Sequence, residues 1–127
     1  MNSLISEVSH KISDGVLIVR MHGRVSLNLL RNYVTEHVSE FAAHDRLIYD
    51  LRDWDVSALT TESLMNADNV FTEVHALRKQ GRAALIIQQH MEELGRIFVA
   101  VYESKEVPVD IGLFSTDAEA DQWVRST

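Results

Sequence analysis

The chain has 127 residues, of which 46% are hydrophobic and 24% are charged, a composition typical of one globular domain spanning residues 1–127. Its formal net charge is −7, from 12 basic and 19 acidic residues, which argues against nucleic acid and anionic membrane surfaces as partners. The absence of cysteine excludes a disulfide scaffold, a thiolate metal site and a cysteine nucleophile.

The sequence shows no targeting or membrane pattern. Its first residues lack a basic start and soon reach Glu7, which is not typical of a signal peptide. The longest apolar run, residues 97–102, is far shorter than the ~20 residues that span a bilayer. We therefore expect a cytoplasmic protein without membrane insertion.

Two strands and one helix are expected in the first third of the chain. Alternating polarity over residues 4–12 predicts a half-exposed strand, and residues 16–19 predict a buried strand after a three-residue turn at 13–15. Apolar residues then recur every three or four positions over residues 26–43, which predicts one helix with Ser26 as its N-cap.

Three further strand–helix pairs follow. Short apolar runs predict strands over residues 46–51, 83–87 and 109–114. Apolar stripes predict helices over residues 60–79, 91–104 and 117–123, with Leu94, Ile97, Phe98 and Val101 inward on the second of them. Thr116 and Glu119 have the spacing of a capping box at the start of the last helix.

This element order predicts an α/β fold with a mixed, mostly parallel five-stranded sheet and helices packed on it. The first strand is expected at an edge and antiparallel to its hairpin partner, because its alternating polarity suits an edge position.

Several segments carry a family resemblance. They are the strand that runs through Asp50 within residues 47–53, the apolar strand within residues 81–87, Gly95 with Arg96, and the final stretch from Phe114 to Val124. In the order of its elements, nearly the whole chain resembles the SpoIIAA-like group, the family of STAS domains and their CRAL-TRIO-like relatives. The resemblance implies a small mixed sheet, no cofactor, and a regulatory or protein-interaction module.

The resemblance also concerns a modification site. In anti-sigma-factor antagonists of this family, an Asp-Ser pair follows the matching strand, and a partner kinase phosphorylates its serine. The matching stretch here, residues 53–61, contains no Asp-Ser pair. Ser57, Thr60 and Thr61 are the nearby hydroxyls that remain.

A candidate surface for a ligand or protein partner lies where the parallel strands end, since such ends share one edge of a sheet. Its residues are Asp50, Arg52, Asp53, Trp54, Ser57, Thr60, Thr61 and His90. Asp50 is expected to accept backbone N–H groups of the following loop. Trp54 either packs in the core, the commoner outcome, or forms a lid or an exposed anchor.

No catalytic or metal site is predicted. Asp50 or Asp53 with His22 or His90 would make an acid–base pair, but the spacing does not require one. None of the six histidines has metal-ligand spacing, and we expect His37 to be partly packed and the others solvated.

Three classes of function stay open at this point. The first is a non-enzymatic regulatory or interaction module, with a possible homodimer. The second is a small apolar-ligand (lipid-like) binding domain, with a cavity lined by Leu64, Phe71, Ile97 and Phe98. The third is a hydrolase-type enzyme that uses the strand-end aspartates and histidines.

Overall fold

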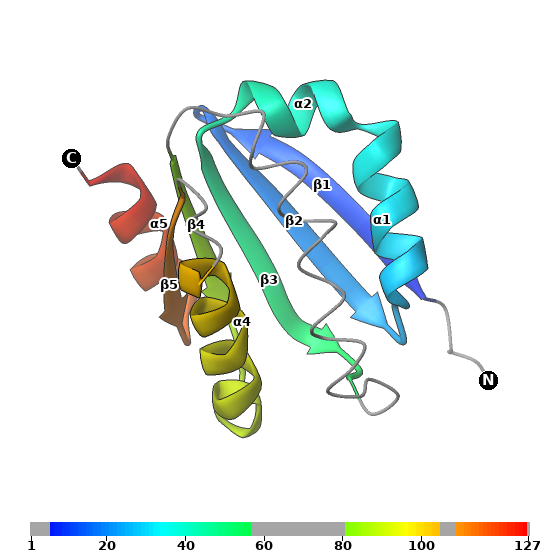
Figure 1. Ribbon diagram of the computed structural model, residues 1–127. Coiled ribbons are helices and arrows are strands. Elements are labelled where there is room, and N and C mark those ends of the chain that lie inside the picture. The colour runs from blue at the N-terminus through cyan, green and yellow to red at the C-terminus, as the bar shows by residue number, and fades with distance from the viewer. Residues whose placement is uncertain (1–5, 57–80, 105–108, 127) are drawn as a thin grey trace.

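The computed structural model describes residues 6–56, 81–104 and 109–126, and the predicted helix over residues 60–79 lies outside them (Figure 1). The strands are β1 (Glu7–Ser13), β2 (Val16–Gly23), β3 (Arg46–Trp54), β4 (Gly81–Ile86) and β5 (Val109–Phe114). The helices are α1 (Leu27–Glu36), α2 (Val38–Ala43), the 3-10 turn η1 (Gln89–Met91), α4 (Glu92–Ser104) and α5 (Asp117–Arg125).

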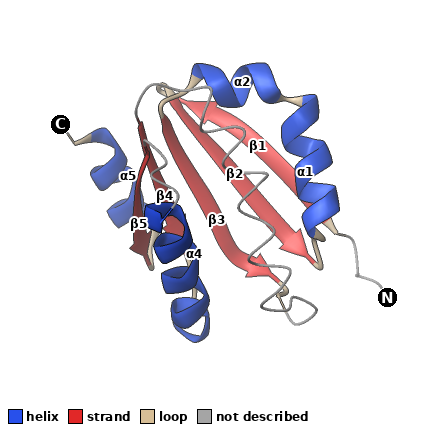
Figure 2. Cartoon of the chain, viewed as in Figure 1, coloured by secondary structure: helices blue, strands red, loops and turns tan. Residues whose placement is uncertain are grey.

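The five strands form one mixed sheet in the order β1-β2-β3-β4-β5 (Figure 2). β1 is antiparallel to β2, and the three other pairs are parallel. The predicted α/β class, the mostly parallel sheet and the antiparallel edge strand are thereby confirmed. Because the sheet order follows the chain order, the carboxyl ends of β2, β3, β4 and β5 lie along one edge of the sheet.

The hairpin between β1 and β2 has a two-residue turn rather than the predicted three-residue turn. Ser13 is still paired with Val16, so only Asp14 and Gly15 connect the strands. Both residues have positive φ, at 48° and 82°. A type I′ turn requires positive φ at these two positions, and its twist matches the right-handed twist of the flanking strands.

The predicted single helix over residues 26–43 is divided at His37, which has φ −117° and ends α1. The predicted N-cap is confirmed, because the Ser26 hydroxyl accepts the Leu29 N–H at 3.0 Å. The apolar spacing stays helical on both sides of the break and therefore could not reveal it. After the break, α2 places Phe41 fully in the core.

His10 of β1 joins the two helices, although we expected it to be solvated. Its Nδ1 is hydrogen-bonded to the Tyr33 hydroxyl of α1, and its Nε2 lies 3.0 Å from Glu40 Oε2 of α2. Only 12% of its side chain is exposed. His37 packs edge-on against it, with ring centroids 4.8 Å apart, and is half-buried as predicted.

His10→Ala is expected to lower the free energy of unfolding by about 1–3 kcal/mol, because two partly buried hydrogen bonds are lost together. His22→Ala, an exposed histidine on the neighbouring strand, should change it by less than about 0.5 kcal/mol. Urea unfolding followed by circular dichroism measures both variants. Equal effects would show that His10 does not hold the helices to β1.

Each face of the sheet carries its own apolar core. On one face, α1, α2 and α4 pack over residues such as Leu17, Leu47 and Leu85. On the other face, Ala120 and Val124 of α5 pack against Ile48 of β3 and Ala84 and Ile86 of β4 (Figure 1). Among the described helices, α5 alone covers this second face.

The later elements follow the prediction in order and type, with differences at their ends and at Ile97. β3 continues three residues further, to Trp54, and η1 precedes the helix that we expected to begin near Met91. Ile97 was expected inward and is exposed, whereas Leu94 packs against the core as predicted. The side chains of Phe98 and Val101 lie outside the described residues.

Candidate functional site

The ends of the central strands are locked side by side. His22 pairs with Asp53 and Gly23 with Trp54, after a register shift in β3. The Gly23 carbonyl accepts the N–H groups of Val25 and Asp55, at 3.0 and 2.9 Å. Gln88, just after β4, donates its side-chain amide to the Arg52 carbonyl at 2.6 Å. The loops that leave β2, β3 and β4 are therefore tied into one rigid edge.

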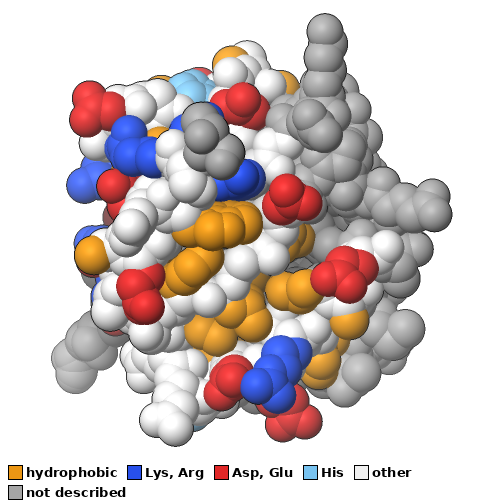
Figure 3. Space-filling view, turned by 90° about the vertical axis from the view of Figure 1, so that its left-hand side faces the viewer, with side chains coloured by type: hydrophobic (Ala, Val, Ile, Leu, Met, Phe, Trp, Pro, Cys, Tyr) orange, Lys and Arg blue, Asp and Glu red, His pale blue; other side chains and the backbone are white. Residues whose placement is uncertain are grey.

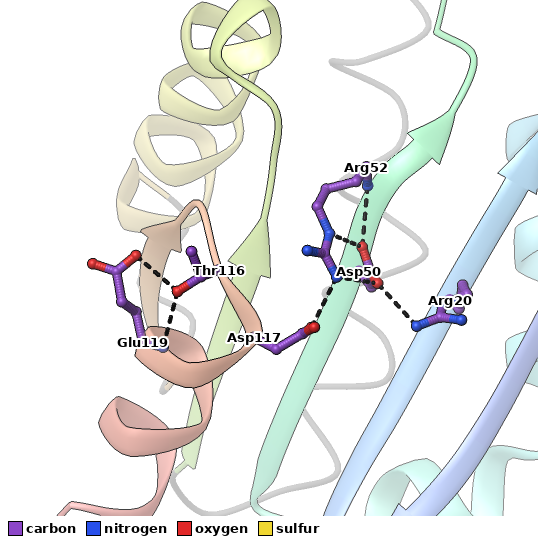
Figure 4. Close-up of polar contacts among 6 residues, drawn as sticks. All are labelled: Arg20, Asp50, Arg52, Thr116, Asp117 and Glu119. Carbon is purple, nitrogen blue, oxygen red and sulfur yellow. Dashed lines mark hydrogen bonds and ion pairs between the residues drawn. The ribbon is translucent and has the colours of Figure 1, made fainter.

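Asp50 is held by two arginines on the α5 face of the sheet (Figure 4). Arg52 grips the carboxylate with both Nε and Nη2, each at 2.9 Å, and Arg20 Nη2 of β2 lies 3.3 Å away. The Arg52 N–H donates to Asp50 Oδ1 at 3.2 Å. The predicted backbone contact of Asp50 is thus present, within the strand rather than in a loop.

The same guanidinium reaches the start of α5. Arg52 Nη2 lies 2.9 Å from Asp117 Oδ1 in the first turn of that helix. Thr116 is the N-cap of α5, because its hydroxyl accepts the Glu119 N–H at 3.2 Å (Figure 4). This confirms one of the two bonds of the predicted capping box; Glu119 Oε1 accepts the Thr116 hydroxyl, at 3.0 Å, in place of the Thr116 N–H. Arg52 therefore connects the central strand to the N-terminus of the helix that covers it.

These contacts fix the charge of Asp50. Burial raises the pKa of Asp50. Hydrogen bonds from the side chain and backbone of Arg52, together with the positive charges of Arg52 and Arg20, lower this pKa by more than burial raises it. The net pKa of Asp50 lies below its ordinary value, and hydrogen bonding to Asp50 raises the pKa of Arg52. Asp50 is therefore ionised at neutral pH, and both of its carboxylate oxygens are engaged by Arg52 and Arg20.

Trp54 is a core residue. Only 4% of its surface is exposed, and its indole N–H donates to the Val25 carbonyl at 3.0 Å. It is the last residue of β3 rather than part of a polar loop. The interpretations of Trp54 as a lid or an exposed anchor are therefore wrong, and core packing, the commoner outcome, is confirmed.

The exposed members of this edge form what we call the strand-end surface. It comprises His22, Arg24, Asp53, Asp55 and His90. Arg24 and Asp55 form an exposed ion pair of 3.3 Å. Of the residues predicted from the sequence, Asp53 and His90 are on this surface and Arg52 lies half-buried behind it, while Ser57, Thr60 and Thr61 lie outside the described residues.

Arg20 and Asp117 complete the Asp50 network and were not expected from the sequence. Arg20 continues the alternation of β2, but only the register with β3 brings it opposite Asp50. In the sequence, Asp117 has only the features of an acidic residue in the first turn of a helix. Within the described ranges, no group of three or more histidine and acidic side chains could hold a metal ion.

The fold is that of known structures. The chain superposes, with a TM-score of 0.64 and 16% sequence identity over 98% of both chains, on an uncharacterised protein of the DUF3478 family with a SpoIIAA-like fold, from Shewanella loihica. It also superposes on an anti-sigma factor antagonist from Mycobacterium paratuberculosis, with a TM-score of 0.63 and 16% identity over 96% of both chains. The SpoIIAA-like fold expected from the resemblance is therefore confirmed.

Comparisons by sequence alone find no match for the chain. No protein-family model matches the chain, and no curated protein matches it either. In the described part of the chain, no helix is both long and apolar enough to cross a membrane.

Proposed function

We propose that this protein is a non-enzymatic regulatory module that binds a protein partner through the strand-end surface. One observation carries the proposal: Asp50, the one buried charged residue among those described, is saturated by Arg52 and Arg20. Asp50, one of the two aspartates considered for acid–base chemistry, thus takes part in ion pairs that join β2, β3 and α5.

The exposed residues suit a binding role. Charged and imidazole groups stand on a rigid base, which limits the entropy that is lost when a partner docks. The likeness in fold to an anti-sigma factor antagonist supports a regulatory role, although fold alone does not determine function. The alternative of an apolar-ligand cavity gains no support. Of its four proposed lining residues, Ile97 is exposed, and the side chains of the other three lie outside the described residues.

A photo-reactive amino acid at position 53 tests the proposal in cells of the source organism. We expect it to cross-link one discrete protein, whereas the same group at exposed position 32 of α1 should not. The captured protein should then bind the purified chain, and Asp53→Arg should weaken that binding at least about tenfold while Asn32→Arg leaves it unchanged. Equal cross-linking at both positions, or none at position 53, would overturn the proposal.

A further inference from the structure

The outer edge of β5 is open. β5 is the last strand of the sheet, and in the described part of the chain no strand pairs with its outer side. The Phe114 carbonyl accepts the Ile87 N–H at 2.9 Å, so Phe114 turns its backbone groups toward β4. Along a strand, the backbone N–H and C=O groups of successive residues point to opposite sides. Those of Ile111 and Leu113 therefore point away from β4, toward the open edge.

Apart from the charged side chain of Asp110, β5 also lacks the features that protect edge strands. It has no lysine, proline or bulge, and its six pairs with β4 follow without a shift. The opposite edge, β1, carries Glu7 and Lys11. The side of the molecule that bears α5 and β5 shows a cluster of hydrophobic side chains with charged side chains around it (Figure 3).

The two sides of β5 differ in chemistry. Ile111 and Leu113 are half-buried and pack against the core on the face of the sheet that α4 covers, where a side chain at Gly95 of α4 would meet Leu113. A side chain at Gly112 would instead meet the rings of Phe114 and Trp123, so residues 110, 112 and 114 face α5. One side of this edge is therefore apolar, whereas the other combines aromatic rings with the exposed carboxylate of Asp110.

Two surface hollows adjoin β5, and Phe114 and Glu119 line both. One, of about 440 Å³, lies between the starts of α4 and α5 and is also lined by Glu92 and Leu113. The other, of about 360 Å³, is also lined by Trp123 of α5. Hollows of this kind beside an open strand are suited to the alternate side chains of an added strand.

The charge around the edge determines what fits there. Glu93, Asp110 and Glu119 have no cationic partner among the described residues. The two nearby arginines are engaged: Arg96 pairs with Glu92 at 2.6 Å, and Arg82 stacks on Trp123 and donates to its carbonyl. A second copy of this chain, with net charge −7, would bring a further Asp110 and Glu119 to the same place.

We propose that the edge of β5 binds an extended segment of a partner protein in which basic side chains alternate with apolar ones. The segment adds a sixth strand to the sheet. Its apolar side chains lie over Ile111 and Leu113, and its lysines or arginines lie over the carboxylates of Asp110 and Glu119. This surface is separate from the strand-end surface, so the proposal goes beyond the function proposed above.

The test uses an octapeptide in which lysine alternates with valine and phenylalanine, added to the isotope-labelled full chain. We expect amide hydrogen exchange of Ile111 and Leu113 to slow by at least about tenfold, with little change at Gly112, whose N–H already faces β4. The matched octapeptide with glutamate in place of lysine should not bind. Glu119→Gln leaves the N-cap bond from the N–H of residue 119 to Thr116 in place and should weaken lysine-peptide binding about two- to fivefold, with Glu7→Gln as the control.

Several results would overturn the proposal. They are no binding of the lysine peptide, equal binding of the glutamate peptide, slowed exchange at β1 instead of β5, and equal effects of the two glutamine variants. The exchange of Ile111 and Leu113 is also measured without peptide, at high and low protein concentration. If their amides are already protected and dilution removes that protection, the proposal is overturned, because a second copy of the chain then occupies this edge. None of these measurements involves position 53, so their outcome is independent of the cross-linking result.

Discussion

Trp54→Ala is expected to lower the free energy of unfolding by about 3–5 kcal/mol. The indole is almost fully buried where β3 ends, and its N–H satisfies the Val25 carbonyl. Truncation leaves both a large cavity and an unpaired buried carbonyl. Equilibrium unfolding in guanidinium chloride measures the loss.

Trp54→Phe separates the two contributions, because it keeps a large aromatic ring and removes the hydrogen bond. We expect it to cost about 1–2 kcal/mol. If Trp54→Ala cost less than about 1 kcal/mol, Trp54 would not be a core residue, and the lid interpretation would have to be restored.

Asp50→Ala is expected to lower the free energy of unfolding by about 2–4 kcal/mol at neutral pH, since it leaves two arginines without their shared partner. The value lies below that of a fully buried pair because the side chains of Arg20 and Arg52 are 57% and 31% exposed and are partly solvated. The neighbouring Asp53→Asn should change stability by less than about 0.5 kcal/mol, because Asp53 is exposed. Equal losses from the two variants would contradict a specific role of Asp50.

The contribution of Asp50 depends on pH. Its pKa is lower in the folded chain than in the unfolded one, so folding favours the ionised form. The stabilisation is fully present above the ordinary aspartate pKa of about 3.9 and is lost as pH falls through the lower folded value. The stability difference between the wild-type chain and Asp50→Ala should therefore be constant from about pH 5 to pH 8 and shrink in more acidic solution.

The fold could be predicted because its elements have clear periodicities. The apolar runs at 83–87 and 109–114 correspond to β4 and β5, and Thr116 caps α5 as its spacing to Glu119 predicts. The break at His37 could not be predicted in the same way. It depends on contacts between α1, α2 and His10 of β1, residues that are far apart in the sequence.

The candidate site was predicted less completely. The sequence predicts that Asp50 lies near the end of a strand and that it accepts a hydrogen bond from a nearby backbone N–H group. Its partner Arg20 depends on the register between β2 and β3, and Asp117 on the way α5 packs across the sheet. Neither is encoded in a local pattern. The predicted strand stops at residue 51, before Trp54, because the register shift within β3 has no signal in the sequence.

The most direct test of the account is a titration of the aspartate carboxyl carbons by nuclear magnetic resonance. If Asp50 is a structural ion bound by Arg52 and Arg20, its carboxyl signal should titrate below the ordinary aspartate pKa and should not change between pH 5 and pH 8. A titration of Asp50 near neutral pH would contradict the account, because it would reveal a carboxyl group that exchanges protons in the range where an enzyme works.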